Sequence, residues 1–208
     1  MVIKNPGRPP GTLEVLDEDV LEASPVLARI HATGGAHPSA WNSVREWGPV
    51  DTCRWDPHPL PAGQWPGSGV TYAASDVKTA VAERFQAARR VDVHTGRPQL
   101  TFWQPTRNLR LLDLANNRGS EWLIRHGASH SLQHVSRAIC RAWAREIRAA
   151  APGLDGLWVQ SRMTGRPVVV LWEPARNSFP EYPEATAALA VPAVRTVVAQ
   201  AALELGYR

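Results

Sequence analysis

Hydrophobic and polar positions change their period several times along the chain, which predicts strands interleaved with helices. Strand-like apolar runs lie at 26–32, 69–75, 99–105, 109–114, 155–161 and 166–174. Helical spacing lies at 75–90, 119–127, 131–150 and 192–205. The alternation is irregular, and no GxGxxG turn follows a strand. The pattern therefore predicts a mixed α/β domain of the α+β class and disfavours a Rossmann fold.

Two segments lack a clear period. Residues 1–25 carry a proline-rich stretch followed by an acidic one, and we expect a leader that forms a mobile arm or a short helix over 17–23. The domain itself is then expected over 26–208, including the C-terminal helix. Residues 34–68 are rich in Gly, Pro and Trp, and a loop of that length in a compact domain is usually functional or disordered.

The helix predicted over 75–90 has one apolar stripe, and Glu83 lies on the side opposite to it. Asp76, a preferred N-cap residue, marks the start of this helix. Periodicity is satisfied equally by a solvated Glu83 and by a Glu83 that faces a cleft. On the preceding strand, Tyr72 alternates with Val70 and Ala74, so it is either a half-buried sheet tyrosine or a residue that stacks against a flat ring.

Three further polar residues are candidates for function. Arg29 lies inside an otherwise apolar strand, where an unpaired charge is costly, so it either reaches the surface or meets an anion. Arg54 lies in the long loop, where an arginine is most often solvated. Ser161 follows a strand, where a serine is usually a turn residue. The positions of these three residues in the sequence do not decide between a structural and a functional role for them.

Composition narrows the function classes. The 208 residues are 44% hydrophobic and 20% charged, which is ordinary for a globular domain. The chain has no apolar run long enough to cross a bilayer and no signal-like N-terminus, so a cytoplasmic location is the expectation. Cys53 and Cys140 are far apart, and the seven histidines form no ligand motif, so neither a disulfide nor a metal site is expected.

The net charge of +4 comes almost entirely from arginine, which suits phosphate or carboxylate partners. The basic residues are scattered rather than clustered. A basic nucleic-acid-binding module, with some of the nine tryptophans as stacking faces, is therefore an alternative from another class. Direct nucleic-acid binding is not the favoured expectation.

Four segments in order resemble the RES domain family, named after its arginine, glutamate and serine. "LARIHA" carries Arg29 and "CRWDPHP" carries Arg54. "GVTYAASDVKTAVAERF" is similar to the family's tyrosine strand and alanine-rich helix, with Tyr72 and Glu83. "GLDGLWVQSRMTGRPVVVLW" is similar to its closing segment, with Ser161. The resemblance covers roughly residues 26 to 175.

The resemblance implies one ADP-ribosyltransferase-like domain with a central, mostly antiparallel sheet flanked by helices. It implies a bacterial toxin that degrades NAD or transfers ADP-ribose, paired with an Xre-type helix-turn-helix antitoxin that occludes the active site. NAD is then the substrate and no metal is needed. Homo-oligomerisation stays open, and a membrane partner is not expected.

The same resemblance assigns roles to the candidates. Glu83 would stabilise the oxocarbenium ion that forms when the nicotinamide–ribose bond breaks, and it is expected to be catalytic together with Arg29. Arg29 and Arg54 would bind the pyrophosphate. Tyr72 would stack on nicotinamide or line its pocket, and Ser161 would hydrogen-bond the nicotinamide amide or a ribose oxygen. Water, phosphate or a protein side chain could each be the nucleophile, so ADP-ribosylation of a protein is an alternative to NAD hydrolysis or phosphorolysis.

Overall fold

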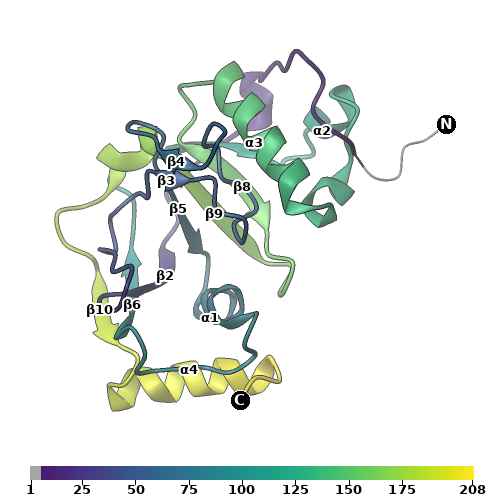
Figure 1. Ribbon diagram of the computed structural model, residues 1–208. Helices are drawn as coiled ribbons and strands as arrows, with labels where there is room; N and C mark the ends of the chain where they lie inside the picture. The colour runs from purple at the N-terminus through teal and green to yellow at the C-terminus, as the bar shows by residue number, and fades with distance from the viewer. Residues whose placement is uncertain (1–5) are drawn as a thin grey trace.

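The computed structural model describes residues 6–208, which form one eight-stranded sheet with helices packed against it (Figure 1). The strand order is β1-β7-β8-β9-β5-β2-β6-β10. The strands are β1 (Val20–Ala23), β2 (Leu27–Ala32), β5 (Val70–Ala74), β6 (Pro98–Trp103), β7 (Leu109–Asp113), β8 (Gly156–Gln160), β9 (Pro167–Trp172) and β10 (Ala185–Ala188). Neighbouring strands are antiparallel except for the parallel pair β7 and β8. The prediction of a mixed α+β fold with a mostly antiparallel sheet is confirmed.

The sheet opens in its middle, between β2 and β5. These two strands share a single register pair, Ala28 with Ala74, whereas β5 pairs with β9 over five residues and β2 pairs with β6 over six. Beyond that pair the loop segment 40–45 approaches both strands. Arg45 forms an antiparallel bridge with Val70 of β5, and its backbone N–H and C=O both bond to that residue. Arg29 of β2 reaches the same segment with its side chain.

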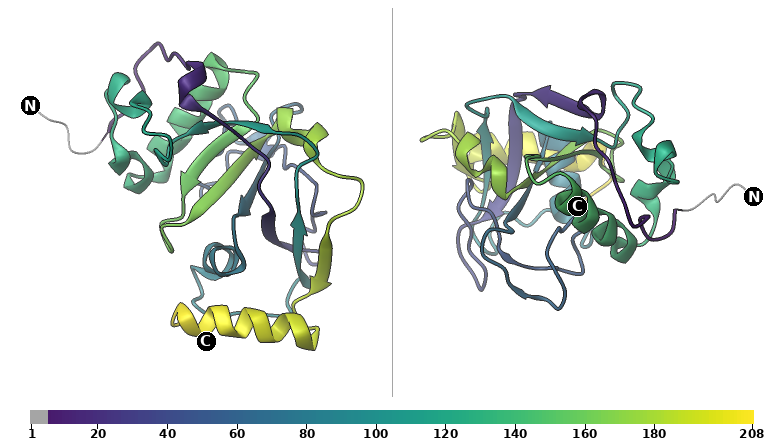
Figure 2. Two further views of the ribbon diagram at one scale, coloured as in Figure 1. Left: turned by 180° about the vertical axis from the view of Figure 1, so that it is seen from behind. Right: turned by 90° about the horizontal axis from the view of Figure 1, so that it is seen from above.

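Helices cover the two halves of the sheet at opposite ends of the molecule (Figures 1 and 2). Helices α1 (Val77–Phe85) and α4 (Pro192–Glu204) share an apolar cluster with β2 and β6. Helices α2 (Trp122–Arg125) and α3 (Arg137–Ala150) share another with β7, β8 and β9. The helices described here are too short or too polar to span a bilayer.

Several predicted elements have different bounds in the structure. The expected arm or helix over 17–23 is wrong: Asp17–Asp19 form one 3-10 turn (η1), and β1 is an edge strand bonded to β7. The long helix expected over 131–150 is two elements, a 3-10 turn at His130–His134 (η2) and then α3. The expected helix over 75–90 ends at Phe85.

Helix α1 begins where the sequence predicts, because Asp76 caps it. The Asp76 carboxylate accepts the backbone N–H of Thr79 at 2.9 Å, which satisfies one of the free donors of the first turn. Ala80, Val81 and Phe85 are buried against the sheet, in agreement with the apolar stripe. That packing fixes the helix and turns Glu83 away from the core.

The Gly-, Pro- and Trp-rich segment 34–68 has a defined path and contains a two-stranded ribbon, β3 (Trp47–Gly48) with β4 (Gly63–Gln64). The side chain of Asp56, at the centre of this segment, is fully buried and bonds to both the segment and β5. The segment is therefore ordered, so the disordered alternative for this long loop does not hold.

Candidate active site

Glu83 and Ser161 are in direct contact, although they lie 78 residues apart. The Ser161 hydroxyl donates to Glu83 Oε1 at 2.6 Å, and the side-chain amide of Gln86 donates to Glu83 Oε2 at 3.1 Å. An O–H···O distance of this length is typical of a charge-assisted hydrogen bond to a carboxylate. Both oxygens of the half-buried Glu83 therefore have a fixed partner.

The turn between β8 and β9 places Ser161 against α1. The Thr79 hydroxyl, one helical turn before Glu83, bonds to the Thr164 hydroxyl of that turn at 3.0 Å. Residues four apart lie on one side of a helix, so this side of α1 faces the β8–β9 turn. At Thr79 and Glu83 the polar side of the helix therefore packs on another element and is not simply solvated.

The hydroxyl of Ser161 has little remaining capacity for a ligand. Ser161 is 4% exposed, and its oxygen accepts the backbone N–H groups of Met163 and Thr164 at 3.1 and 3.2 Å. Its single proton goes to Glu83. In this geometry Ser161 orients the Glu83 carboxylate.

Arg29 is a half-buried arginine without a carboxylate partner. Its Nη1 donates to the carbonyl groups of Ala40, Trp41 and Ser43 at 3.3, 2.8 and 3.2 Å. Across residues 6–208, no Asp or Glu lies within ion-pair distance of it. Burial, followed by the charges of Arg45 and Arg84, lowers the pKa of Arg29 to about 10. The guanidinium is still charged at neutral pH, and a bound anion would stabilise it.

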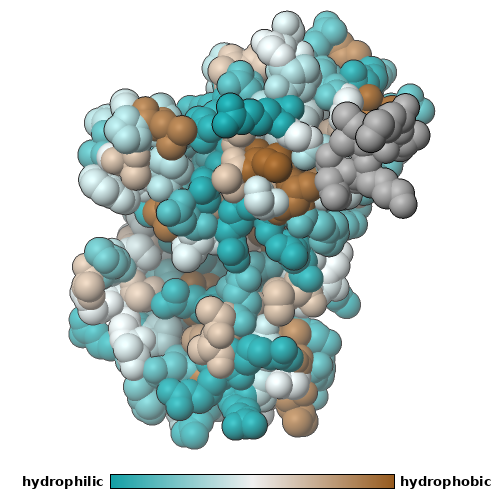
Figure 3. Space-filling model, turned by 45° about the vertical axis from the view of Figure 1, so that its right-hand side comes forward, coloured by the Kyte–Doolittle hydropathy of each residue, from teal (hydrophilic) through white to brown (hydrophobic). Residues whose placement is uncertain are grey.

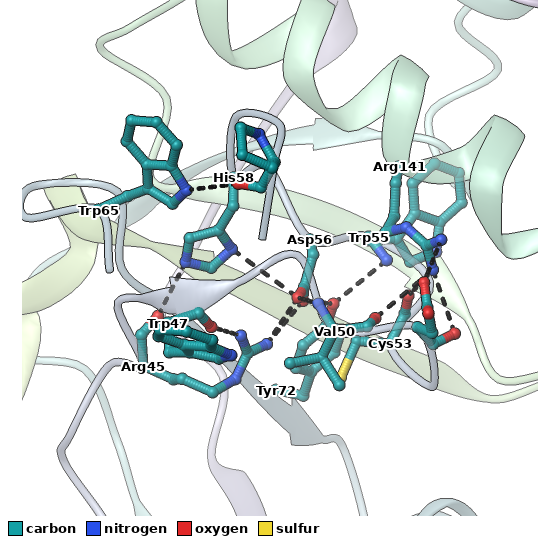
Figure 4. A network of polar contacts seen from close by, with 12 residues as sticks. Arg45, Trp47, Val50, Cys53, Trp55, Asp56, His58, Trp65, Tyr72 and Arg141 are labelled. Carbon is teal, nitrogen blue, oxygen red and sulfur yellow. Dashed lines mark hydrogen bonds and ion pairs between the residues drawn. The ribbon is translucent and has the colours of Figure 1, made fainter. Parts of the chain in front are cut away.

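Tyr72 is held by a buried carboxylate in the long loop (Figure 4). Its hydroxyl donates to Asp56 Oδ1 at 2.8 Å and accepts the backbone N–H of Trp55 at 3.2 Å. Burial, together with the negative charge of Asp56, raises the pKa of Tyr72 well above its ordinary value, so the hydroxyl stays protonated and remains a donor. The hydroxyl anchors the loop, and only the ring is available to line a pocket.

Arg54, which belongs to the same loop, lines a basic hollow of about 510 Å³. Its Nη1 donates to the carbonyl of Val135 and to the thiol of Cys140. The hollow is lined by Asp51, Arg54, His134, Val135, Ser136, Arg137, Arg141 and Arg162. Four arginines against one aspartate make this lining strongly positive, which fits the expected role of Arg54 as an anion contact.

The predicted residues form three groups: the Glu83–Ser161 pair, the hollow with Arg54, and Arg29 on β2. The residues that follow Ser161 and Glu83 in the sequence link this pair to the other two groups. Glu83 and Ser161 are bonded to each other, and Arg162, the residue after Ser161, lines the hollow that contains Arg54. Arg84, the residue after Glu83, acts electrostatically on Arg29. Figure 3 shows a largely hydrophilic face that is hollowed between its upper part, at the height of α3, and its lower part, at the height of α4.

Two functional candidates were missed in the sequence: Arg45 and Asp56. Arg45 Nη2 contacts both oxygens of Asp56 at 2.8 Å, and Asp56 is fully buried. Asp56 lies in the "CRWDPHP" segment, two residues after Arg54, which the resemblance had singled out. Arg45 has no comparable signal, because the segment around it lacks a period.

The described residues give little support to metal binding, thiol chemistry or stacking on nucleic-acid bases. Within 6–208 no group of three or more His, Cys, Asp or Glu side chains could hold a metal ion. Both cysteines are free, and burial raises the pKa of each thiol. Most of the nine tryptophans are unavailable for stacking on bases. The buried ones are Trp55, Trp103, Trp122, Trp143, Trp158 and Trp172.

The fold and the Arg, Glu and Ser positions define a mixed α+β domain with a carboxylate–serine pair beside unpaired arginines. The RES domain family model matches residues 26–193, so the chain belongs to the RES domain family. The chain is also similar to one in the crystal structure of the M. tuberculosis MbcT–MbcA toxin–antitoxin complex. The TM-score is 0.57 at 19% identity, over 88% of this chain and 93% of that one, which shows a shared fold. The comparison with curated proteins finds no match.

Proposed function

We propose that this protein cleaves the nicotinamide–ribose bond of NAD, and that it is the toxin of a bacterial toxin–antitoxin pair. The observation that carries this proposal is the 2.6 Å hydrogen bond from the buried Ser161 to Glu83. It fixes one carboxylate oxygen on the polar side of α1, in a chain that belongs to the RES domain family.

The proposed chemistry needs one carboxylate and a site for two phosphates. When the bond from ribose C1′ to the nicotinamide nitrogen breaks, the electron pair leaves with nicotinamide and positive charge develops on the ribose. Glu83, held by Ser161 and Gln86, would stabilise that charge without having to reorient. Arg29 would bind the pyrophosphate, since its guanidinium lacks a carboxylate in the described chain. Arg54 would add positive charge from the neighbouring hollow.

The acceptor for the ADP-ribose group is the second part of the proposal. Water would give free ADP-ribose, phosphate would give a phosphorylated ADP-ribose, and a protein side chain would give a modified protein. In each case the acceptor oxygen or nitrogen bonds to C1′ and releases its proton. The protein is incubated with NAD, with and without phosphate, and the products are identified by mass.

Glu83→Gln is the test variant, with Glu204→Gln as its matched control. Glu204 is a helical glutamate on α4 that is hydrogen-bonded to Gln200, much as Glu83 is to Gln86, but it lies outside the site. We expect Glu83→Gln to lose nearly all nicotinamide release, with only a slow residual rate, while keeping its circular dichroism spectrum, and Glu204→Gln to retain activity. Intact NAD with the wild-type protein, with and without phosphate, would overturn the proposal.

An antitoxin partner is proposed because the similar structure is a toxin–antitoxin complex. We expect an Xre-type antitoxin encoded beside this chain to cover the Glu83–Ser161 pair, as the family resemblance implies. Co-expression should then protect cells and their NAD. A complex that consumes NAD as fast as the free protein would refute occlusion. Because such an enzyme needs NAD of the producing or target cell, we place its action in the cytoplasm.

A further inference from the structure

Asp56 is a fully buried carboxylate that collects hydrogen bonds from three parts of the chain (Figure 4). Arg45 Nη2 donates to both of its oxygens at 2.8 Å. The backbone N–H of Val50 donates to Oδ2 at 2.8 Å, and the hydroxyl of Tyr72 donates to Oδ1 at 2.8 Å. The Nδ1 atom of His58 lies 3.7 Å from Oδ2. One side chain thus ties the loop on both sides of residue 50 to strand β5.

A buried carboxylate is costly unless its charge is paired and its oxygens are satisfied. Here Arg45 supplies the charge. Burial by itself would lower the pKa of Arg45, but the Asp56 carboxylate outweighs burial and raises it. The pairing also fixes the direction of the guanidinium, because Nη1 of Arg45 donates to the carbonyl of Trp47.

The side chain that Asp56 holds is not wholly enclosed. The Arg45 side chain is 33% exposed, whereas that of Asp56 is 0% exposed. Arg45 lies two residues after Ser43, whose carbonyl accepts from Arg29 at 3.2 Å. Segment 40–45 therefore holds the Arg29 guanidinium with its carbonyl groups and carries a second guanidinium, that of Arg45, whose charge contributes to lowering the pKa of Arg29. Of these two arginines, Arg45 has a carboxylate partner among the described residues and Arg29 does not.

Two guanidinium groups held near each other repel, and an anion that binds between them offsets the repulsion by attracting both. We propose that Arg45 is a second contact for the pyrophosphate of the substrate, beside Arg29, and that Asp56 is the positioning residue that holds Arg45 in place. This inference rests on the proposed function for the identity of the anion. The buried Asp56 keeps Arg45 charged and rigid, so little side-chain entropy is lost when the anion binds.

A second buried pair in the same chain supplies a matched control. Asp155 is 2% exposed, accepts both Nη atoms of Arg107 at 2.7 Å, and accepts the backbone N–H of Arg110 at 2.8 Å. It repeats the structural role of Asp56, a buried carboxylate with an arginine and a backbone donor, at the start of β8 and beside the 3-10 turn η3 (Glu173–Ser178). Asp155→Asn therefore reports what is lost when such a pair is broken without a change at Arg45 or Asp56.

The test compares Asp56→Asn, Arg45→Gln and Asp155→Asn with the wild-type protein. In NAD cleavage we expect Asp56→Asn and Arg45→Gln each to raise KM about tenfold, with kcat within about threefold of wild type. Asp155→Asn should leave KM unchanged, although it should lower the melting temperature about as much as Asp56→Asn does. Adding Asp56→Asn to Arg45→Gln should have little further effect on KM, because Asp56 acts through Arg45.

A titration with inorganic pyrophosphate, followed by calorimetry, separates this inference from the proposed function. We expect wild type and Asp155→Asn to bind alike, and Asp56→Asn and Arg45→Gln to bind about tenfold more weakly. If wild type cleaves NAD but Asp56→Asn and Asp155→Asn have equal KM values, the inference fails and the function stands. If wild type leaves NAD intact, the function fails, and equal pyrophosphate binding by all variants then overturns the inference too. Arg45→Gln keeps the test decisive if Asp56→Asn does not fold.

Discussion

Removing the Ser161 hydroxyl tests whether this serine works on the substrate or on Glu83. The bond from Ser161 Oγ to Glu83 Oε1 is 2.6 Å long, and Ser161 has no second proton to donate. A hydrogen bond to a charged group is worth roughly 1.5–3 kcal/mol. If the bond holds Glu83 in its catalytic orientation, Ser161→Ala should lower kcat by about ten- to 100-fold, at about 1.4 kcal/mol for each factor of ten.

Ser161→Ala should lower the free energy of unfolding by less than it raises the activation free energy of nicotinamide release. Ser161→Ala also frees the backbone N–H groups of Met163 and Thr164. Met163 is 41% exposed, so water can replace the lost acceptor there, and we expect a cost of about 1 kcal/mol in urea unfolding. Ser178→Ala is the matched control: Ser178 is 1% exposed and donates to the carbonyl of Ala175 at 2.7 Å, away from the site.

A double-mutant cycle identifies the mechanism. Nicotinamide release is measured for wild type, Ser161→Ala, Glu83→Gln and the double variant. If Ser161 acts through Glu83, adding Ser161→Ala to Glu83→Gln should change kcat by less than about threefold. Additive effects would refute this reasoning and would instead indicate that Ser161 contacts the substrate independently.

Three more predictions concern the scaffold. A Cβ at Gly156 would lie 1.8 Å from the carbonyl oxygen of Val170, so Gly156→Ala should lower the free energy of unfolding in urea by about 3 kcal/mol. Gly153 has open space around it, so Gly153→Ala should lower the free energy of unfolding hardly at all. Equal values for the two variants would refute the packing argument. Burial lowers the pKa of His58 despite the nearby Asp56, so below about pH 6.5 the unfolded chain binds more protons than the folded one. The free energy of unfolding should therefore fall as the pH drops below that value. If His58→Gln has the same dependence of unfolding free energy on pH as wild type, this reasoning is contradicted. Asp76→Ala should destabilise α1 by about 1 kcal/mol while Asp76→Asn should not, because asparagine retains the capping oxygen; equal melting temperatures for the two variants would count against the cap.

Local signals in the sequence account for the elements that carry the site. The N-cap at Asp76 and the apolar stripe predict the start of α1 and the polar side that holds Glu83. The end of the helix was predicted too late because Arg89 has a φ of 47°, a left-handed conformation that its sequence does not signal. Strand β1 reads locally as a helix, but its pairing with β7 overrides that preference.

The contacts of the site depend on distant partners, and no periodicity reports them. The sequence places Glu83 opposite the core, yet the turn that meets it comes 78 residues later. Arg45 and Asp56 were not predicted for the same reason. Both residues lie in a loop whose sequence has no hydrophobic period. Their pairing depends on the folded path of that loop, in which Asp56 also accepts hydrogen bonds from Val50 and Tyr72. Arg29 has partners that neither alternative named, since loop carbonyl groups accept its Nη1 and no carboxylate of residues 6–208 pairs with it.

Arg107 and Arg29 differ in how the charge of each guanidinium is matched. Arg107 follows the ordinary rule: its charge is matched in a bidentate pair with a buried aspartate, and the pair ties β7 to the start of β8. Arg29 breaks that rule inside an apolar strand, and the positive charges near it make its own charge less favourable. Such departures from local consistency persist where a ligand compensates for them. We therefore propose the unpaired charge in β2 as the place where an anionic substrate would bind.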